Sequence, residues 1–407
     1  MTGWSEAPAA LEGLRVVEVA EGVAAPYCAK LLADLGAEVI KVEPPGKGDA
    51  CRDVGPFYHD EPSPDSGLLF SFLNTSKLGV TLDVESAFGR DLLGRIVGEA
   101  DVLLVGGELA EIESRGLGPA AWRAWHPRLV CAYVTPFGLE GQRAGWRGGE
   151  LVAFQMAGVG LVTPRERLSN QELPPLKAGG NQALMVAGLT AAVATLHALF
   201  ARDATGEGQL VDVSEVEPLA SFQFLNVARW AYAGDPGDHG YGEGSRRVHC
   251  RDGDVSFLLF TGQDQQWQAF RDLIGNPEWA ACYDRLPAGR SPEADEFWAR
   301  LNEWAGGYTK EEVYRRAQAL RVPLFPENDI AEAVESDQVR ARGFVQEMPL
   351  ASGATARAPV APYAFSETPA RFRRPAPALG RDNRAVFCDR LGLSEEELRR
   401  AYDAGLV

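Results

Sequence analysis

The sequence has little of what marks a metal-binding, disulfide-bonded or nucleic-acid-binding protein. No two of its six cysteines have C-x-x-C spacing, and its five histidines include no H-x-x-x-H pair. These absences predict reduced thiols and no metal site. Positive charge is also in deficit, since 40 lysines and arginines face 57 aspartates and glutamates, giving a net charge of −17. That balance disfavours nucleic acid and anionic membrane surfaces as general partners.

The first ten residues lack the basic and apolar regions of a secretory signal, so the sequence predicts a cytoplasmic protein. A membrane span has one candidate, the largely apolar stretch from Ala183 to Phe200. This stretch is rich in alanine, glycine and threonine and contains His197. Such residues suit a tightly packed buried helix better than a lipid-facing one, and we expect no membrane partner.

Strand-like and helical segments alternate through the first half of the chain. Leu14 to Ala20, Ala24 to Leu35 and Glu38 to Glu43 predict a βαβ unit with a parallel strand pair. The pattern continues with strands over 79–83, 101–105, 129–134 and 210–214, and helices over 89–99, 119–125, 150–156 and 182–202. It predicts an α/β fold with a large Rossmann-like parallel-sheet domain.

The pattern changes near residue 229. Residues 1–228 form the predicted large domain, and residues 229–329 a smaller α+β domain with a strand over 255–260 and helices over 263–274, 293–304 and 310–321. Residues 330–407 form a C-terminal segment with a polar helix, a proline-rich extended stretch and a last helix opened by Ser394. The glycine-rich stretch Gly234 to Gly244 is either an active-site lid or a surface loop.

Several segments together resemble the family III CoA transferases, which include formyl-CoA and carnitine CoA transferases and the α-methylacyl-CoA racemases. The segments that carry the resemblance are Leu14 to Ala20, Ala25-Pro26, Leu32 to Pro44, Gly48-Asp49 with Arg52, Asn74 with Lys77, Thr205 to Ser214, Ser336 to Phe344 and Pro375 to Gly380. The resemblance implies a large domain built from both chain ends, so that residues 330–407 return to it. It also implies two chains interlocked as a homodimer.

The resemblance further implies chemistry on a carboxylate. In the family's transferases a carboxylate attacks an acyl-CoA thioester, forming a mixed anhydride and then an enzyme–CoA thioester. The matching residue here is Glu150, eight residues before Gly158, where the family carries aspartate. A displacement of ~1 Å can cost on the order of 10²-fold in rate, although glutamate has the same carboxylate chemistry. Alternatively, Glu150 is only a charge at a helix N-terminus.

Coenzyme A, as acyl-CoA, is the implied cofactor, and a carboxylic acid is the other substrate. By resemblance Glu21, Val23, Ala24 and Ala25 lie near the pantetheine, and Asn74 belongs to the same site. Thr135 stands where some members carry lysine. The predicted cations are Lys41, Arg52 and Lys77, with solvated surface charge as the alternative interpretation.

Other functions remain open at this point: a related acyl-CoA hydrolase or racemase, or a CoA-binding homologue that has lost catalysis. A racemase needs a proton-transfer group on each side of the α-carbon. Gly149 stands where that branch carries histidine, and 180–188 holds no acid or base. A dinucleotide-dependent oxidoreductase is disfavoured because the turn Glu21 to Pro26 has no G-x-G-x-x-G motif. The acyl donor and acceptor are not specified by the sequence.

Overall fold

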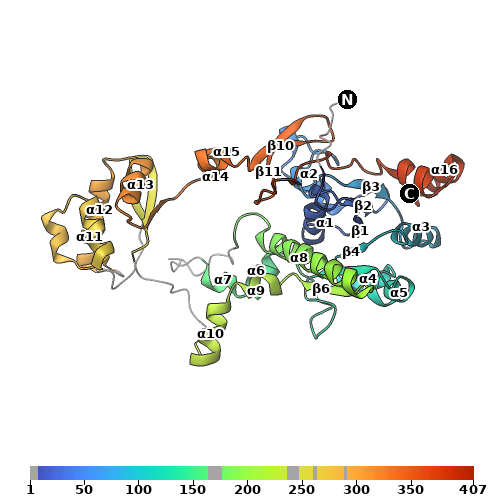
Figure 1. Cartoon of the computed structure of the whole chain (residues 1–407), viewed down its shortest axis with the longest axis horizontal. Helices are drawn as coiled ribbons and strands as arrows, with labels where there is room; N and C mark the ends of the chain where they lie inside the picture. Colours follow the sequence, from blue (N-terminus) through green and yellow to red (C-terminus); the bar gives the residue numbers. More distant parts are fainter. Residues whose placement is uncertain (1–7, 164–176, 236–246, 260–263, 288–290) are drawn as a thin grey trace. The chain divides into compact units, whose positions relative to one another are not determined.

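The computed structural model describes residues 8–163, 177–235, 247–259, 264–287 and 291–407. The chain divides into two compact units: residues 1–237 with 343–407 form the larger one, and residues 238–342 the smaller (Figure 1). Both boundaries lie later along the chain than the predicted 228 and 329. The reason is that α10 (Phe224–Ala233) belongs to the larger unit, while α14 (Ile330–Glu335) and α15 (Asp337–Ala341) belong to the smaller one.

A six-stranded parallel sheet forms the centre of the larger unit, in the order β3-β2-β1-β4-β5-β6. The predicted α/β class is therefore confirmed. The strand order reverses between β1 and β4, and ligands of open α/β sheets bind at the carboxyl ends of strands beside such a reversal. The strands are β1 (Arg15–Val19), β2 (Glu38–Glu43), β3 (Leu78–Thr81), β4 (Val102–Gly106), β5 (Val130–Thr135) and β6 (Leu210–Ser214).

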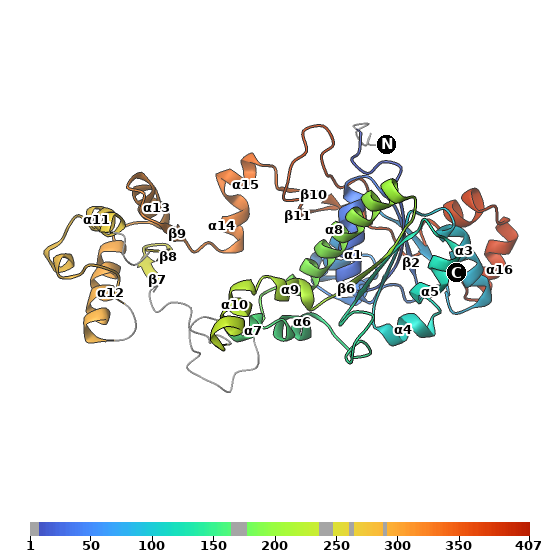
Figure 2. The ribbon, with the colours of Figure 1, turned by 60° about the horizontal axis from the view of Figure 1, so that its bottom comes forward.

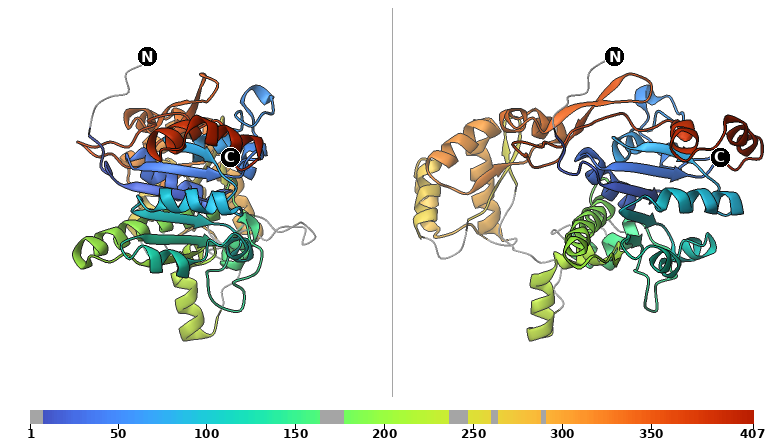
Figure 3. Two further views of the ribbon diagram at one scale, coloured as in Figure 1. Left: turned by 90° about the vertical axis from the view of Figure 1, so that its right-hand side faces the viewer. Right: turned by 45° about the vertical axis from the view of Figure 1, so that its right-hand side comes forward.

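Helices cover both faces of this sheet. α1 (Ala24–Asp34) and α8 (Gln182–Thr205) lie side by side on one face (Figure 2). α3 (Ala87–Val97) and α16 (Glu395–Asp403) pack on the other (Figure 3). Burial on both faces explains the nearly continuous apolar strands. The unit's other helices are α2 (Leu68–Leu73), α4 (Leu109–Ser114), α5 (Pro119–Trp125), α6 (Glu150–Met156), α7 (Val159–Val162) and α9 (Glu217–Ser221).

The helix α8, with 24 residues, is the longest helix among the described residues. A Cβ at Gly188 would lie 2.3 Å from the carbonyl oxygen of Ala24, so glycine is what lets α8 lie directly against α1. Among the described residues, α8 is the one helix long and apolar enough to cross a membrane, and half of its apolar window is buried. It packs on α1, β5 and β6, as a core helix does.

The C-terminal segment binds back to the larger unit. Asn383 donates a hydrogen bond to Thr81 Oγ1 and accepts one from the Thr81 backbone N–H, both at 2.8 Å. Asp382 accepts a hydrogen bond from the Gly79 backbone N–H at 2.8 Å. Both chain ends therefore build this unit. An antiparallel hairpin, β10 (Val345–Pro349) and β11 (Thr355–Pro359), lies across the start of residues 349–379, which the sequence predicted as extended.

The smaller unit pairs a three-stranded antiparallel sheet, in the order β7-β8-β9, with helices around an aromatic core. Trp267, Phe270 and Phe297 stack in that core. Most of the predicted lid, Gly234 to Gly244, lies outside the described residues. The elements are β7 (Arg247–Cys250), β8 (Gly253–Phe257), α11 (Asp264–Leu273), α12 (Pro292–Ala305), α13 (Lys310–Ala319) and β9 (Leu324–Pro326), followed by α14 and α15.

Candidate active site

Glu150 is the first residue of α6, and its side chain reaches the start of α8. Its Oε1 accepts a hydrogen bond from the Ala183 backbone N–H at 3.2 Å, and its Oε2 accepts one from Leu184 at 3.1 Å. The first N–H groups of a helix have no intrahelical partner, and the helix dipole is positive there. The start of α8 therefore binds the Glu150 side chain in the way that helix N-termini bind anions.

An apolar cluster beneath Glu150 fixes the three elements around it. Ala153 and Phe154 of α6 are buried against Ala183 of α8 and Leu219 of α9. Val216, at the start of α9, packs against the same cluster. The carboxylate of Glu150 is therefore positioned by packed helices rather than by a loop.

A second carboxyl group, Glu215, lies near Glu150. It follows the last residue of β6 directly, and its backbone N–H donates to the carbonyl oxygen of Thr135 at 2.9 Å. Partial burial, together with the negative charge of Glu150, raises the pKa of Glu215 to about 7. The sequence analysis missed Glu215, although a residue directly after a parallel strand lies at the ligand-binding edge of a sheet.

Thr135 lies beside Glu215 at the carboxyl end of β5. Its side chain is fully buried, and its Oγ1 has no hydrogen-bond partner among the described residues. Buried hydroxyls normally find a partner. Because the Glu215 backbone N–H bonds the Thr135 carbonyl oxygen, the predicted site residue Thr135 lies in the same part of the structure as the two carboxyl groups.

A cavity of about 300 Å³ opens at the carboxyl ends of β1, β2 and β3. Glu21, which the sequence analysis placed near pantetheine, lines it. Val23, Ala24 and Ala25 follow Glu21 and are buried at the start of α1. The charged residues in the cavity wall are Glu21, Glu43, Lys47, Asp83, Glu85 and Arg115.

Lys47 and Arg115 are the cations of the cavity wall, and the sequence analysis named neither. Lys47 is exposed in the loop after β2. Arg115 pairs with Glu21 at 3.5 Å and with Glu85 at 3.8 Å. Both lie in connections between elements, where periodicity gives no signal. The cavity therefore combines a strongly acidic wall with two cations that an anionic ligand can reach.

The predicted cations Lys41 and Lys77 lie inside the protein instead. Both side chains are fully buried and meet Glu18, at 3.0 Å from Lys41 and 2.7 Å from Lys77. Lys41 also pairs with Asp49 at 2.8 Å, and Lys77 donates to Asn74 Oδ1 at 2.8 Å. Burial opposes the charge of Lys41, but Asp49 and Glu18 outweigh it and raise the pKa of Lys41.

Arg52 is the third predicted cation and is 1% exposed. It forms two 2.7 Å hydrogen bonds with Glu43, a third bond with Asp65 at 2.9 Å, and stacks over Phe70. Because these internal contacts leave no free face for a phosphate, the geometry favours a structural role for Lys41, Arg52, Lys77 and Asn74. No group of three or more metal-ligating side chains occurs among the residues that the structure describes.

Comparison with known proteins gives one consistent family. The family model described as CoA-transferase family III matches residues 11–383. The chain is 29% identical to the formyl-CoA:oxalate CoA-transferase of Streptomyces coelicolor, covering 98% of this chain and 99% of that one. It is 30% identical to succinyl-CoA:(R)-benzylsuccinate CoA-transferase subunit BbsE of Thauera aromatica, covering 92% and 93%.

Solved structures agree on the fold. A CAIB/BAIF family protein from Brucella suis superposes with a TM-score of 0.79 at 26% identity, covering 94% of this chain and 99% of that one. A Mycobacterium tuberculosis protein superposes with a TM-score of 0.77 at 24% identity, covering 94% and 100%. The similarity thus spans both units.

Proposed function

The chain belongs to CoA-transferase family III, and from this premise we propose that Glu150 carries the transfer of CoA from an acyl-CoA to a carboxylic acid. Relatives at about this similarity are named as CoA-transferases, so the enzyme class is that of a CoA-transferase. Their names give formyl and succinyl groups as donors, and oxalate and benzylsuccinate as acceptors. The shared chemistry is a CoA thioester exchanged with a carboxylate.

The observation that carries the proposal is the pair of hydrogen bonds from Ala183 and Leu184 to the Glu150 carboxylate. They hold the carboxylate in a fixed orientation, and a carboxylate is the nucleophile that attacks a thioester. Attack would give a mixed anhydride, and CoA would then attack the Glu150 acyl carbon to give an enzyme–CoA thioester. In that second step the same N–H groups are positioned to stabilise the oxyanion that develops on Glu150.

We place CoA along the edge between the cavity and Glu150. The loop from Glu21 leads into α1, and Ala24 of α1 abuts Gly188, one turn after the residues that bind Glu150. Lys47 and Arg115 are the cations that this placement assigns to CoA phosphates. Phosphates would compete with Glu21 and Glu85 for Arg115, so the acidic wall predicts modest CoA affinity.

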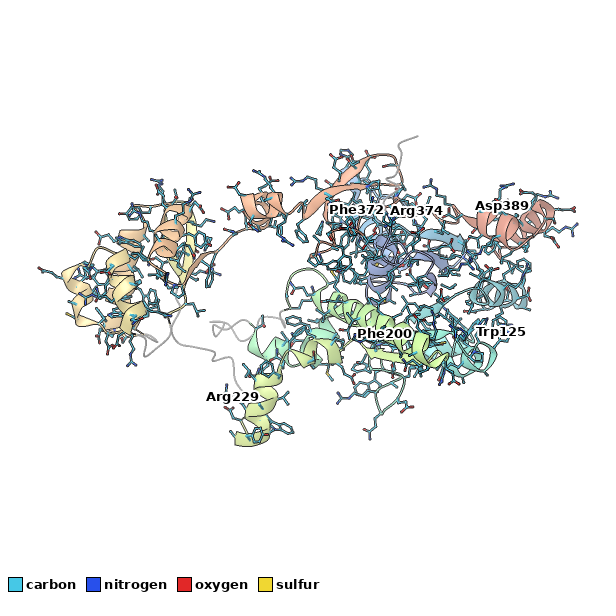
Figure 4. The ribbon with its side chains drawn as sticks, in the orientation of Figure 1. Trp125, Phe200, Arg229, Phe372, Arg374 and Asp389 are labelled. Carbon is cyan, nitrogen blue, oxygen red and sulfur yellow. The ribbon has the colours of Figure 1, made fainter. Side chains whose placement is uncertain are left out.

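A homodimer is also proposed, since the larger unit exposes a group of large apolar side chains. They lie on and just before α10, where the Tyr232 side chain is 94% exposed, and on α8, where Phe200 is 80% exposed (Figure 4). Monomeric proteins rarely expose contiguous apolar patches of this kind. The residues of the α10 surface are Phe222, Phe224, Leu225, Val227, Trp230 and Tyr232.

A cytoplasmic location stays a prediction.

Intact-protein mass after incubation with formyl-CoA or succinyl-CoA tests the proposal. A CoA-sized adduct is expected on wild type and absent from Glu150→Gln, which keeps the side-chain size but removes the nucleophilic oxygen. Glu207→Gln is the matched control, because this exposed glutamate lies before the amino end of β6, whereas ligands of such sheets bind at the carboxyl ends of the strands. An adduct of equal yield on Glu150→Gln would refute the assignment.

The alternatives have their own readouts. Net CoA release without an acceptor acid indicates a hydrolase, and exchange of the acyl α-proton with deuterated water indicates a racemase. CoA binding without any turnover indicates a homologue that has lost catalysis.

A further inference from the structure

Two carboxyl groups approach one region of the structure from different elements. Glu150 begins α6 and binds the first N–H groups of α8. Glu215 leaves β6 and leads into α9, whose Val216 and Leu219 pack against Ala183 of α8. The same apolar cluster therefore holds both acids near the start of α8, and Glu215 is close enough to feel the charge of Glu150.

The two acids have different surroundings. Both oxygens of Glu150 accept backbone hydrogen bonds. The Glu215 carboxyl, by contrast, is bonded to no other side chain or backbone group within the part of the chain that the structure describes. Since no described residue bonds this partly buried carboxyl, it is available to bond a substrate atom. Pairs of titratable groups with such different environments commonly divide acid and base roles.

We propose that Glu215 is the proton carrier of the transfer reaction, giving its proton to the CoA sulfur when the thioester breaks and taking it back when that sulfur attacks. This inference rests on the proposed covalent role of Glu150. It goes beyond that role because it assigns a function to a group that the attack on the thioester does not itself use.

An oxygen of ionised Glu150 attacks the thioester carbonyl, the carbon–sulfur bond breaks, and the sulfur leaves with the electron pair and receives the Glu215 proton. The products are a mixed anhydride on Glu150, a CoA thiol and ionised Glu215. Glu215 then removes the thiol proton as the sulfur attacks the Glu150 acyl carbon, which releases the donor acid as a carboxylate. The acceptor carboxylate repeats both steps in reverse order.

The electrostatic surroundings support this role. Glu150 is the charged group that faces Glu215 from α6, and Glu217 is the charged group on α9 itself. The first four turns of α8, from Gln182 to Leu196, carry no titratable side chain. No cation is therefore supplied by these elements to hold Glu215 ionised. A carboxyl with a pKa of about 7 carries a proton for part of the time at neutral pH, which suits acid–base exchange with a thiol.

The pH dependence of adduct formation tests the proposal, using formyl-CoA and succinyl-CoA as donors. Glu215→Gln keeps a hydrogen-bond donor but cannot transfer a proton. We expect it to form the adduct on Glu150 at least about 10²-fold more slowly than wild type, and to lose the fall in rate as pH rises through about 7. Glu215→Asp restores a carboxyl and should recover part of the rate. Glu217→Gln, an exposed neighbour on α9, is the control and should behave as wild type.

A second readout does not depend on the donor. The infrared band of a protonated carboxyl should be present below pH 7, vanish above it, and be missing from Glu215→Gln. Persistence of that band in Glu215→Gln, or a wild-type rate and pH profile for Glu215→Gln with the Glu150 adduct intact, overturns this inference alone. An adduct that persists on Glu150→Gln and maps to Glu215 overturns the proposed nucleophile as well, as does a wild type that forms no adduct.

Discussion

At the scale of single residues, the surroundings of an acid decide its role in this protein. Two backbone N–H groups at the start of α8 hold the Glu150 carboxylate, whereas partial burial and the neighbouring Glu150 charge raise the pKa of Glu215. Both side chains have the same chemistry. For Glu215 the difference comes from burial first and from the nearby charge of Glu150 second.

The raised pKa of Glu215 makes stability depend on pH. Its pKa rises from 4.5 to about 7 on folding, so the folded protein binds more protons than the unfolded chain between these values. The contribution of Glu215 to stability is therefore full below pH 4.5 and is lost as pH rises through about 7. Urea unfolding should show wild type losing on the order of 1–3 kcal/mol relative to Glu215→Gln over that window. Parallel pH profiles for the two proteins would contradict the raised pKa.

Substitutions of Lys41 and Lys47 test the two roles assigned to lysines here. Lys41 is assigned a structural role, and Lys47 is proposed to bind CoA. Lys41→Met leaves Glu18 and Asp49 buried with less compensation and should cost about 3–5 kcal/mol in urea unfolding. Lys47→Met should leave stability within about 0.5 kcal/mol and weaken CoA binding about fivefold by calorimetry. A stable Lys41→Met protein with weakened CoA binding would instead support the role that the sequence analysis gave to Lys41.

The lysines also show what a sequence conveys about a site. The resemblance predicted that Lys41, Arg52 and Lys77 bind CoA, whereas the structure shows each of them buried against a carboxylate. It could not show that Glu18, Glu43 and Asp49 converge on them, since the fold and not the spacing along the chain brings these side chains together. Lys47 and Glu215 were not predicted from the sequence at all, since neither belongs to a periodic pattern or to a segment that carries the family resemblance.

At the scale of elements, the contact between α1 and α8 connects the cavity to Glu150. Gly188→Ala places a methyl group against the Ala24 carbonyl and should destabilise the protein by about 1–3 kcal/mol. Because the shift of α8 would also move Ala183 and Leu184, adduct formation should slow. Gly94→Ala is the matched control: it lies inside α3, where a Cβ meets only ordinary contacts, and should be neutral or stabilising by up to about 1 kcal/mol. Equal effects of the two substitutions on unfolding would contradict the close approach.

Elements with a strong local signal were predicted from the sequence with correct bounds. The strand over 38–43 and the helices beginning at 119 and 150 match the structure, because Pro119 and the apolar periodicity mark them locally. The helix α10 was not predicted, because none of its residues is fully buried and no N-cap side chain marks its start. The hairpin of β10 and β11 was missed since Thr355 to Pro359 has little β propensity.

At the scale of the whole molecule, the exposed α10 surface predicts association between two chains. Trp230→Glu places a charge on that surface and should shift the protein toward monomer in light scattering at micromolar concentration. Exposed Glu140→Gln is a control that should leave the mass unchanged. A monomeric wild type, or a dimer unaffected by Trp230→Glu, would contradict the proposed role of α10.

The mass of the peptide that contains Glu150, after a single incubation with succinyl-CoA or formyl-CoA, tests the central claim most directly. The account predicts a CoA-sized increase on that peptide, a slower increase in Glu215→Gln, and none in Glu150→Gln. An increase on another peptide, or an unlabelled protein that still exchanges CoA between two acids, would show that Glu150 does not carry the transfer.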